Sequence, residues 1–178
     1  MRILAISGSL RAASLNSQLL RAIARVAPAD IAVDIYDELA TIPLFNPDLE
    51  PNPPRAVINL RNRIIGSTAV LIASPKYAHG VSGPLKNALD WMVGNESFVN
   101  KPVAVLNASP RATIARAALL ETLATMSACI AHEACIAIPL LGSTLTEDAV
   151  VAEPEMALKL RAALRSLQSF SRSVGSEI

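Results

Sequence analysis

Short, nearly unbroken runs of aliphatic residues recur along the chain. Each run is four to six residues long and shows no alternation of polar and apolar positions. Such runs are typical of parallel strands that are covered on both faces of a sheet. The pattern predicts strands at Arg2–Ser7, Ile31–Tyr36, Ala69–Ser74, Pro102–Asn107 and Cys135–Ile138.

Segments with the period of an α-helix separate these runs. Their apolar residues recur at three- or four-residue spacing, which places them on one face of a helix. These stripes lie in residues 15–26, 57–64, 85–92, 119–126 and 156–170. Ser14 suits the N-cap of the first helix, and Pro84 suits the first turn of the third. The alternation predicts a three-layer α/β sandwich in which helices cover both faces of a five-stranded parallel sheet.

Length and composition indicate one globular domain. The chain has 178 residues and contains 52% hydrophobic and 17% charged residues, which excludes intrinsic disorder. We expect a single domain over residues 1–178, with 172–178 as a frayed tail and the Pro- and Asn-rich stretch Pro43–Pro54 as a surface loop. The net charge of +1 and the aromatic share of 3% argue against a nucleic-acid partner.

The remaining compositional features concern the membrane, metals and redox state. The sequence contains no apolar stretch of the roughly 18 residues that a spanning helix needs, so no membrane partner is expected. Cys129 and Cys135 form no Cys-x-x-Cys motif and lack the ligands of a zinc site. We therefore expect a reduced, cytoplasmic protein without a metal site.

The segment after the first predicted strand has the chemistry of a phosphate site. In doubly wound sheets, ligands bind beyond the carboxyl ends of the strands where the strand order reverses. Residues 7–17 are rich in hydroxyl groups, contain Arg11 and open onto a helix N-terminus, which favours an anion. The segment has neither the P-loop nor the Gly-x-Gly-x-x-Gly pattern, so a phosphate monoester fits best. The alternative is a polar turn followed by a capped helix.

Two segments carry a family resemblance. Gly8-Ser9-Leu10-Arg11-x-x-Ser14-x-Asn16 resembles the FMN-phosphate loop of the NADPH-dependent FMN reductase family, flavodoxin relatives that include quinone, azo-dye and chromate reductases. The segment Pro75–Trp91 resembles the family's Pro-Glu-Tyr motif followed by Ser-Gly-x-Leu-Lys-Asn-x-x-Asp-Trp. The resemblance implies a flavodoxin-like fold with strand order 2-1-3-4-5.

The resemblance also implies a site for non-covalently bound FMN. Its residues would be Ser9, Arg11, Ser14, Asn16 and Ser17 at the phosphate, Pro75, Lys76, Tyr77, Ala78 and His79 beside the ring, and Ser109 and Arg111 in a third loop. Three features depart from the family: Lys76 replaces an acidic residue, Ala78 offers only its backbone, and the third loop lacks glycines. His79 is alternatively a plain loop residue, and Arg111 a solvated side chain.

By resemblance, the chain is an NAD(P)H-dependent oxidoreductase. NADPH or NADH would reduce FMN, which would then reduce a small electron acceptor such as free flavin, a quinone, an azo compound or an oxidised metal species. This chemistry demands no catalytic side chain, because the cofactor performs it. Family members form homodimers or homotetramers, and an exposed Trp91-Met92-Val93 patch would suit such contacts. The alternatives are a flavodoxin-like electron carrier and a flavin-free regulatory relative.

Overall fold

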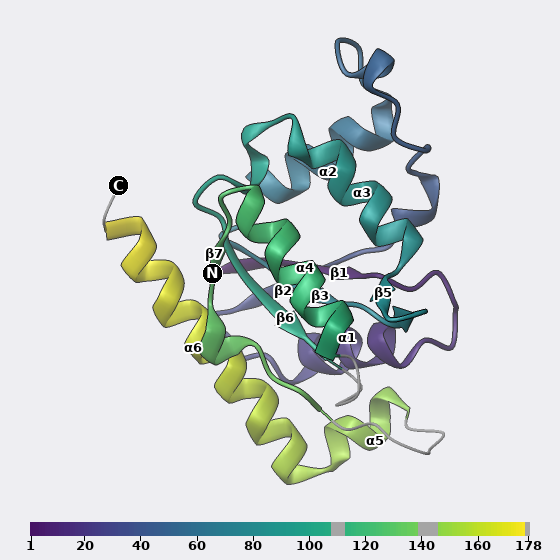
Figure 1. The fold of residues 1–178 in the computed structure, drawn as a ribbon. Helices are drawn as coiled ribbons and strands as arrows, with labels where there is room; N and C mark the ends of the chain where they lie inside the picture. Colours follow the sequence, from purple (N-terminus) through teal and green to yellow (C-terminus); the bar gives the residue numbers. More distant parts are fainter. Residues whose placement is uncertain (108–112, 139–145, 177–178) are drawn as a thin grey trace.

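The computed structural model describes residues 1–107, 113–138 and 146–176. Five parallel strands form the main sheet in the spatial order β2-β1-β3-β6-β7 (Figure 1). They are β1 (Arg2–Ser7), β2 (Ala32–Tyr36), β3 (Ala69–Ala73), β6 (Pro102–Leu106) and β7 (Cys129–Ile130). Numbered along the chain within this sheet, the order is 2-1-3-4-5, so the predicted flavodoxin-like fold class is confirmed.

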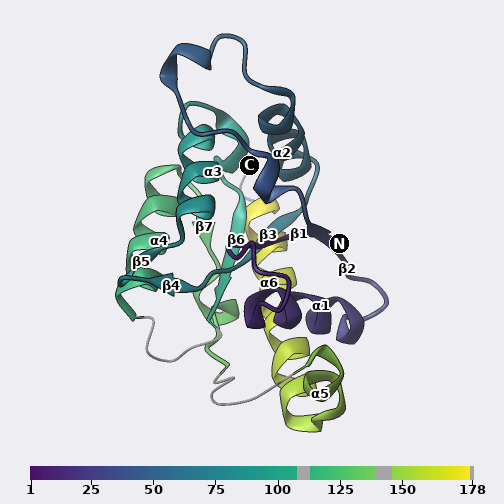
Figure 2. The same cartoon turned by 90° about the vertical axis from the view of Figure 1, so that its right-hand side faces the viewer.

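Helices cover both faces of the sheet. They are α1 (Leu15–Val26), α2 (Arg55–Ile65), α3 (Gly83–Val93), α4 (Thr113–Thr125), α5 (Glu147–Ala152) and α6 (Pro154–Ser176). Helices α1 and α6 pack on one face and α2, α3 and α4 on the other (Figure 2). The short α5 lies against α1, where Glu147 pairs with Arg21 and Arg25.

The two apolar cores follow from the period-2 geometry of the strands. In β1, Ile3 and Ala5 belong to the core under α1 and α6, whereas Leu4 and Ile6 belong to the core under α2, α3 and α4. All four side chains are at most 2% exposed. The absence of polar alternation in β1, β3 and β6 therefore has a direct cause, since both faces of these three strands are buried. The edge strand β2 differs, because Ala32 and Asp34 are exposed.

The fifth strand differs from the prediction. The regular ladder of β7 lies at Cys129–Ile130, and the predicted strand Cys135–Ile138 contributes only a bridge between Asn107 and Ala137. Val103 pairs with Ile130, and Asn107 pairs with Ala137. The four-residue step from Val103 to Asn107 is therefore matched by a seven-residue step on the partner segment. The 3₁₀ turn His132–Ala134 accommodates the three extra residues. Within this interruption, Val105 N–H donates to Cys135 Sγ at 3.2 Å instead of to a carbonyl oxygen.

The C-terminal segment also differs from the prediction. Helix α6 continues to Ser176, so most of the predicted frayed tail is helical, and residues 177–178 lie outside the described part. Leu160, Leu164 and Leu167 are fully buried against the sheet, as the apolar stripe predicts. Among the described helices, none has the length and apolar character required to cross a membrane.

The pH dependence of stability tests the burial of Tyr36, which lies at the end of β2. Its side chain is 2% exposed and its hydroxyl group has no hydrogen-bond partner. Burial, reinforced by the negative charge of Glu38, raises the pKa of Tyr36 to about 12. The unfolded chain therefore ionises this phenol first, near pH 10, and stability is lost as the pH rises towards 12.

We expect Tyr36→Phe to leave the free energy of unfolding at about pH 8 unchanged or raised, since it removes a buried hydroxyl that has no partner. The variant should also lose less stability than the wild type between about pH 8 and about pH 11. Urea unfolding at both pH values measures the difference, with Tyr77→Phe, at a side chain that is 58% exposed, as the matched control. An equal loss in the wild type and Tyr36→Phe would contradict the prediction.

Candidate functional site

The carboxyl ends of three neighbouring strands bring the predicted loops to one edge of the sheet. Ser7 of β1 pairs with Ala73 of β3, and Ala73 pairs with Leu106 of β6. The segments that follow β1 and β3 are consequently neighbours, and Figure 2 looks onto this edge. The third predicted segment falls within residues 108–112, so Ser109 and Arg111 lie outside the described residues.

The serine hydroxyl groups of the segment after β1 form hydrogen bonds with one another and with its backbone N–H groups. Ser14 is the N-cap of α1, and its hydroxyl oxygen accepts from Ser17 N–H at 3.4 Å. The hydroxyl groups of Ser17 and Ser7 lie 2.8 Å apart, and Ser9 Oγ accepts from Arg11 N–H at 3.3 Å. The predicted alternative of a capped helix is thus correct as a description of the local structure, and it leaves room for a ligand role.

The electrostatics at the start of α1 favour an anion. The first turn of this helix contains no acidic residue, and its leading N–H groups form the positive end of the helix dipole. Asn16, in the same turn, is 6% exposed, and its Oδ1 atom has no hydrogen-bond partner. Arg11 is exposed and adds a guanidinium group to the same segment. The phosphate-site prediction therefore fits the local charge and the polar groups still available.

The segment after β3 folds into a small antiparallel hairpin, which the sequence did not predict. Its strands are β4 (Lys76–Tyr77) and β5 (Gly80–Val81). The turn residues Ala78 and His79 both have positive φ, 48° and 62°. Pro75 and Lys76 are half-buried, whereas Tyr77, Ala78 and His79 are exposed. The hairpin thus presents an exposed tyrosine ring and a turn in a strained backbone conformation at the carboxyl edge.

The strain in this turn is testable by substitution. Most residues with a Cβ are disfavoured in the left-handed region of backbone conformation, but Asn tolerates it better than Ala does. We expect Ala78→Asn to raise the free energy of unfolding by about 0.5–1 kcal/mol. The same exchange at Ala162, an exposed helical position of α6, should lower it by about 0.5 kcal/mol. Chemical unfolding measures both variants, and destabilisation by Ala78→Asn would refute the strain argument.

Helix α3 braces the connection between β2 and α2. Asn87 Nδ2 donates to Pro43 O at 2.9 Å, and its Oδ1 accepts from Phe45 N–H at 2.8 Å. Trp91 Nε1 also donates to Pro43 O at 2.8 Å, and its ring meets Phe45 edge-on at 5.1 Å. Asn87 and Trp91 therefore hold the start of the predicted surface loop, most of which is exposed.

Trp91, Met92 and Val93 do not form the exposed patch that would suit subunit contacts. Trp91 is 2% exposed and Met92 0%, and only Val93, at 56%, faces solvent. Three consecutive apolar residues cannot all lie on one face of a helix, and α3 turns the first two into the core. The burial of Trp91 supports a role in packing the core.

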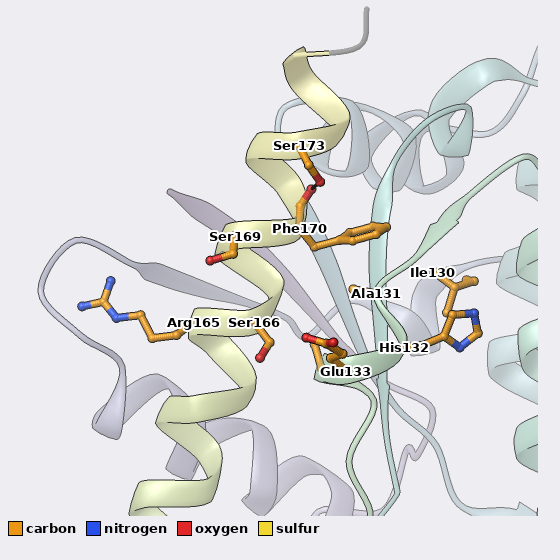
Figure 3. A pocket seen from close by; sticks show the side chains of 10 residues that line it. Ile130, Ala131, His132, Glu133, Arg165, Ser166, Ser169, Phe170 and Ser173 are labelled. Carbon is orange, nitrogen blue, oxygen red and sulfur yellow. Dashed lines mark hydrogen bonds between the residues drawn. The ribbon is translucent and has the colours of Figure 1, made fainter.

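Two cavities along α6 contain none of the predicted site residues in their lining. A cavity of about 620 Å³ lies between α6 and residues 130–134, and a second of about 480 Å³ adjoins it along α6. Figure 3 shows Phe170 projecting across the first cavity, while Arg165 extends away from it and pairs with Asp30. This cavity lies beside β7, which pairs with the first residues of β6 and not with its carboxyl end.

Two further polar residues at the carboxyl edge were not singled out by the sequence. Arg116 is half-buried in the first part of α4 and lines a small cavity with Pro75 and Asn107. Ser82 is fully buried immediately before α3. Arg116 carried no distinguishing signal, because it lies in an ordinary helical segment, whereas Ser82 is the serine of the Ser-Gly-x-Leu-Lys-Asn motif and was assigned no role in the site.

The fold and this edge define a doubly wound α/β protein in which a helix N-terminus free of acidic residues lies at the point where the strand order reverses. The model of the NADPH-dependent FMN reductase family matches residues 1–140. The chain belongs to this family, so the predicted resemblance is confirmed.

Individual relatives agree with this assignment. The chain is 38% identical over 112 residues to an NAD(P)H-dependent FMN reductase of Pseudomonas aeruginosa, covering 61% of this chain and 60% of the relative. It is 39% identical over 111 residues to a quinone reductase of Pseudomonas putida, covering 60% and 59%. The match thus spans about three fifths of the length of these relatives.

A solved structure matches over almost the whole chain. The flavoenzyme NAD(P)H:(acceptor) oxidoreductase FerB of Paracoccus denitrificans aligns with a TM-score of 0.78 at 26% identity. The alignment covers 98% of this chain and 97% of that protein. The similarity therefore includes α6 and the other elements beyond the segment that the curated relatives match.

The residues at the edge fit the FMN of this family. A phosphate monoester needs hydrogen-bond donors and positive potential, and the N–H groups and dipole at the start of α1 offer both. A flat heterocycle needs an exposed apolar wall next to accessible backbone, and the hairpin offers Tyr77 and its strained turn. The two parts lie on adjacent strands of the sheet.

Proposed function

We propose that this chain binds FMN non-covalently and acts as an NAD(P)H-dependent oxidoreductase that passes electrons to a small acceptor. The observation that carries the proposal is that two features lie next to each other at one edge of the sheet. They are a helix N-terminus that favours an anion, after β1, and an exposed hairpin after the neighbouring strand β3. Family membership and the names of the relatives support it. When bound, the flavin supplies the hydride chemistry.

The side chains and backbone of this chain then bind and orient. In this proposal Ser9, Arg11, Ser14, Asn16 and Ser17 surround the phosphate, and Pro75, Lys76, Tyr77, Ala78 and His79 flank the ring. The Arg11 guanidinium makes paired hydrogen bonds to phosphate oxygens, and the exposed Tyr77 ring covers one side of the heterocycle. Ser109 and Arg111 remain predicted ring contacts.

The acceptor is proposed as a class. Free flavin, a quinone, an azo compound and an oxidised metal species all accept electrons from a reduced flavin, and several relatives are named as quinone reductases or quinone oxidoreductases. The proposed electron donor is NADPH or NADH. An electron carrier that does not react with nicotinamides is the alternative that the following experiment excludes or supports.

Flavin titration followed by anaerobic reduction tests the proposal. Apoprotein titrated with FMN should shift the flavin absorbance and quench its fluorescence. Anaerobic addition of NADPH or NADH to the complex should then bleach the flavin absorbance, and a quinone should restore it. An FMN spectrum unchanged by the protein would refute the binding proposal, and bound flavin that neither nicotinamide bleaches would favour the carrier.

Two further expectations complete the proposal. We place the protein in the cytoplasm, because Cys129 and Cys135 are free thiols, as a reducing compartment favours. We also propose a homodimer or homotetramer, as in the family. Light scattering coupled to size exclusion measures the assembly, and a monomer at micromolar concentration would contradict it.

A further inference from the structure

One hydrogen bond joins the two segments that the proposed FMN site comprises. Ser82 is 0% exposed, and its hydroxyl group donates to Gly8 O at 2.5 Å across 74 residues of sequence. Gly8 lies in the phosphate segment after β1, and Ser82 follows the hairpin that would flank the ring.

Ser82 makes this bond instead of the one its position favours. It is the N-cap of α3, where a serine hydroxyl ordinarily accepts from the N–H of the second or third helical residue. No such side-chain bond is present at this cap. The early N–H groups of α3 thus lack the side-chain acceptor that Ser14 provides to α1, and the Ser82 hydroxyl is directed to the other segment.

The junction around Gly8 is too tight for any side chain. A Cβ on Gly8 would lie 2.6 Å from Ser74 Oγ and 2.9 Å from Ser82 Oγ, both closer than real contacts allow. Gly8 N–H also donates to Ala73 O at 2.8 Å. The N–H of Gly8 is thus bonded to the last residue of β3, and its carbonyl is bonded to Ser82 beyond the hairpin.

We propose that Ser82 is a positioning residue for FMN, which sets the spacing between the phosphate segment and the hairpin. This inference rests on the proposed function. FMN must contact both segments at once, whereas riboflavin, which lacks the phosphate, depends on the hairpin. A fixed spacing lets FMN bind without ordering the phosphate segment first, so loss of the bond reduces the affinity for FMN more than that for riboflavin.

Ligand binding to the apoprotein tests this role without reference to turnover. For Ser82→Ala we expect the FMN affinity to fall about tenfold, as the loss of one buried hydrogen bond implies, and the riboflavin affinity to fall less than about threefold. Fluorescence quenching of each flavin measures both constants. Hydrogen exchange of the apoprotein should also show faster exchange in peptides that cover residues 8–14.

Ser67→Ala is the matched control. Ser67 is 7% exposed, and its hydroxyl donates to Ile64 O at 2.7 Å, so the same change removes the same kind of buried bond. Ser67 follows α2 and precedes β3, at the opposite end of the strands from the proposed site. Both variants should lower the melting temperature, but Ser67→Ala should leave both flavin affinities unchanged.

The outcomes separate this inference from the proposed function. Wild-type protein that binds no FMN overturns both. Wild-type protein that binds FMN, with equal losses of FMN and riboflavin affinity in Ser82→Ala or with no loss in either, overturns only the role of Ser82. If Ser82→Ala does not fold, Ser82→Cys keeps the shape with a weak S–H donor and should show the same selective loss of FMN affinity.

Discussion

Replacement of Trp91 by alanine is expected to lower the free energy of unfolding by about 3–5 kcal/mol. Trp91 is the largest of the fully buried side chains, and its ring packs edge-on against Phe45. Its Nε1–H group also donates to Pro43 O, which accepts a second hydrogen bond from Asn87 Nδ2. The alanine variant therefore loses core volume and one of the two hydrogen bonds that Pro43 O accepts from α3.

Two variants separate the contributions of packing and hydrogen bonding. Trp91→Phe keeps an aromatic ring but removes the donor, so it should cost clearly less than Trp91→Ala, with about 1 kcal/mol of its loss due to the bond to Pro43. Val93→Ala, at the exposed neighbouring position of α3, should change stability by less than about 0.5 kcal/mol. Urea unfolding measures all three, and a Trp91→Ala loss no greater than that of Val93→Ala would contradict the packing role.

Replacement of Arg11 by alanine is expected to weaken FMN binding by a factor of about 10 to 100, since a hydrogen bond to a charged group contributes about 1.5–3 kcal/mol. Arg11 is exposed, and its backbone N–H bonds to Ser9 Oγ within the phosphate segment. Because its side chain has no role in the core, the melting temperature of the apoprotein should not change. Fluorescence titration of the apoprotein with FMN measures the loss.

The specificity of the Arg11 effect is the decisive part of this prediction. Riboflavin affinity should be the same in Arg11→Ala and the wild type, because riboflavin carries no phosphate. Arg55→Ala, at an exposed arginine that begins α2, should leave the affinity for both flavins unchanged. An unchanged FMN affinity in Arg11→Ala would remove this residue from the phosphate site.

The pattern of apolar residues was sufficient for four of the five strands. Those strands are buried on one or both faces along most of their length, so their hydrophobic character is visible in the sequence. The fifth could not be located in this way, because its two residues at Cys129–Ile130 are only half-buried and a 3₁₀ turn separates them from Ala137. An interrupted edge strand has no continuous apolar run to detect.

The candidate site was predictable to a similar degree. The phosphate segment was located from its hydroxyl groups and Arg11, since a helix N-terminus has a local signature at Ser14. The hairpin was missed because its turn uses Ala78 and His79 at positive φ, where Asn and Gly are the expected residues. Ser109 and Arg111 remain predictions.

The sequence by itself determined the layered fold and the family, because each depends on residues that are close together along the chain. Only the tertiary structure decided that Trp91 is buried, that Asn87 braces the chain at Pro43, and that the Ser82 hydroxyl reaches Gly8. These contacts join residues more than 40 positions apart. The sheet order sets such distances, and a local pattern contains no information about them.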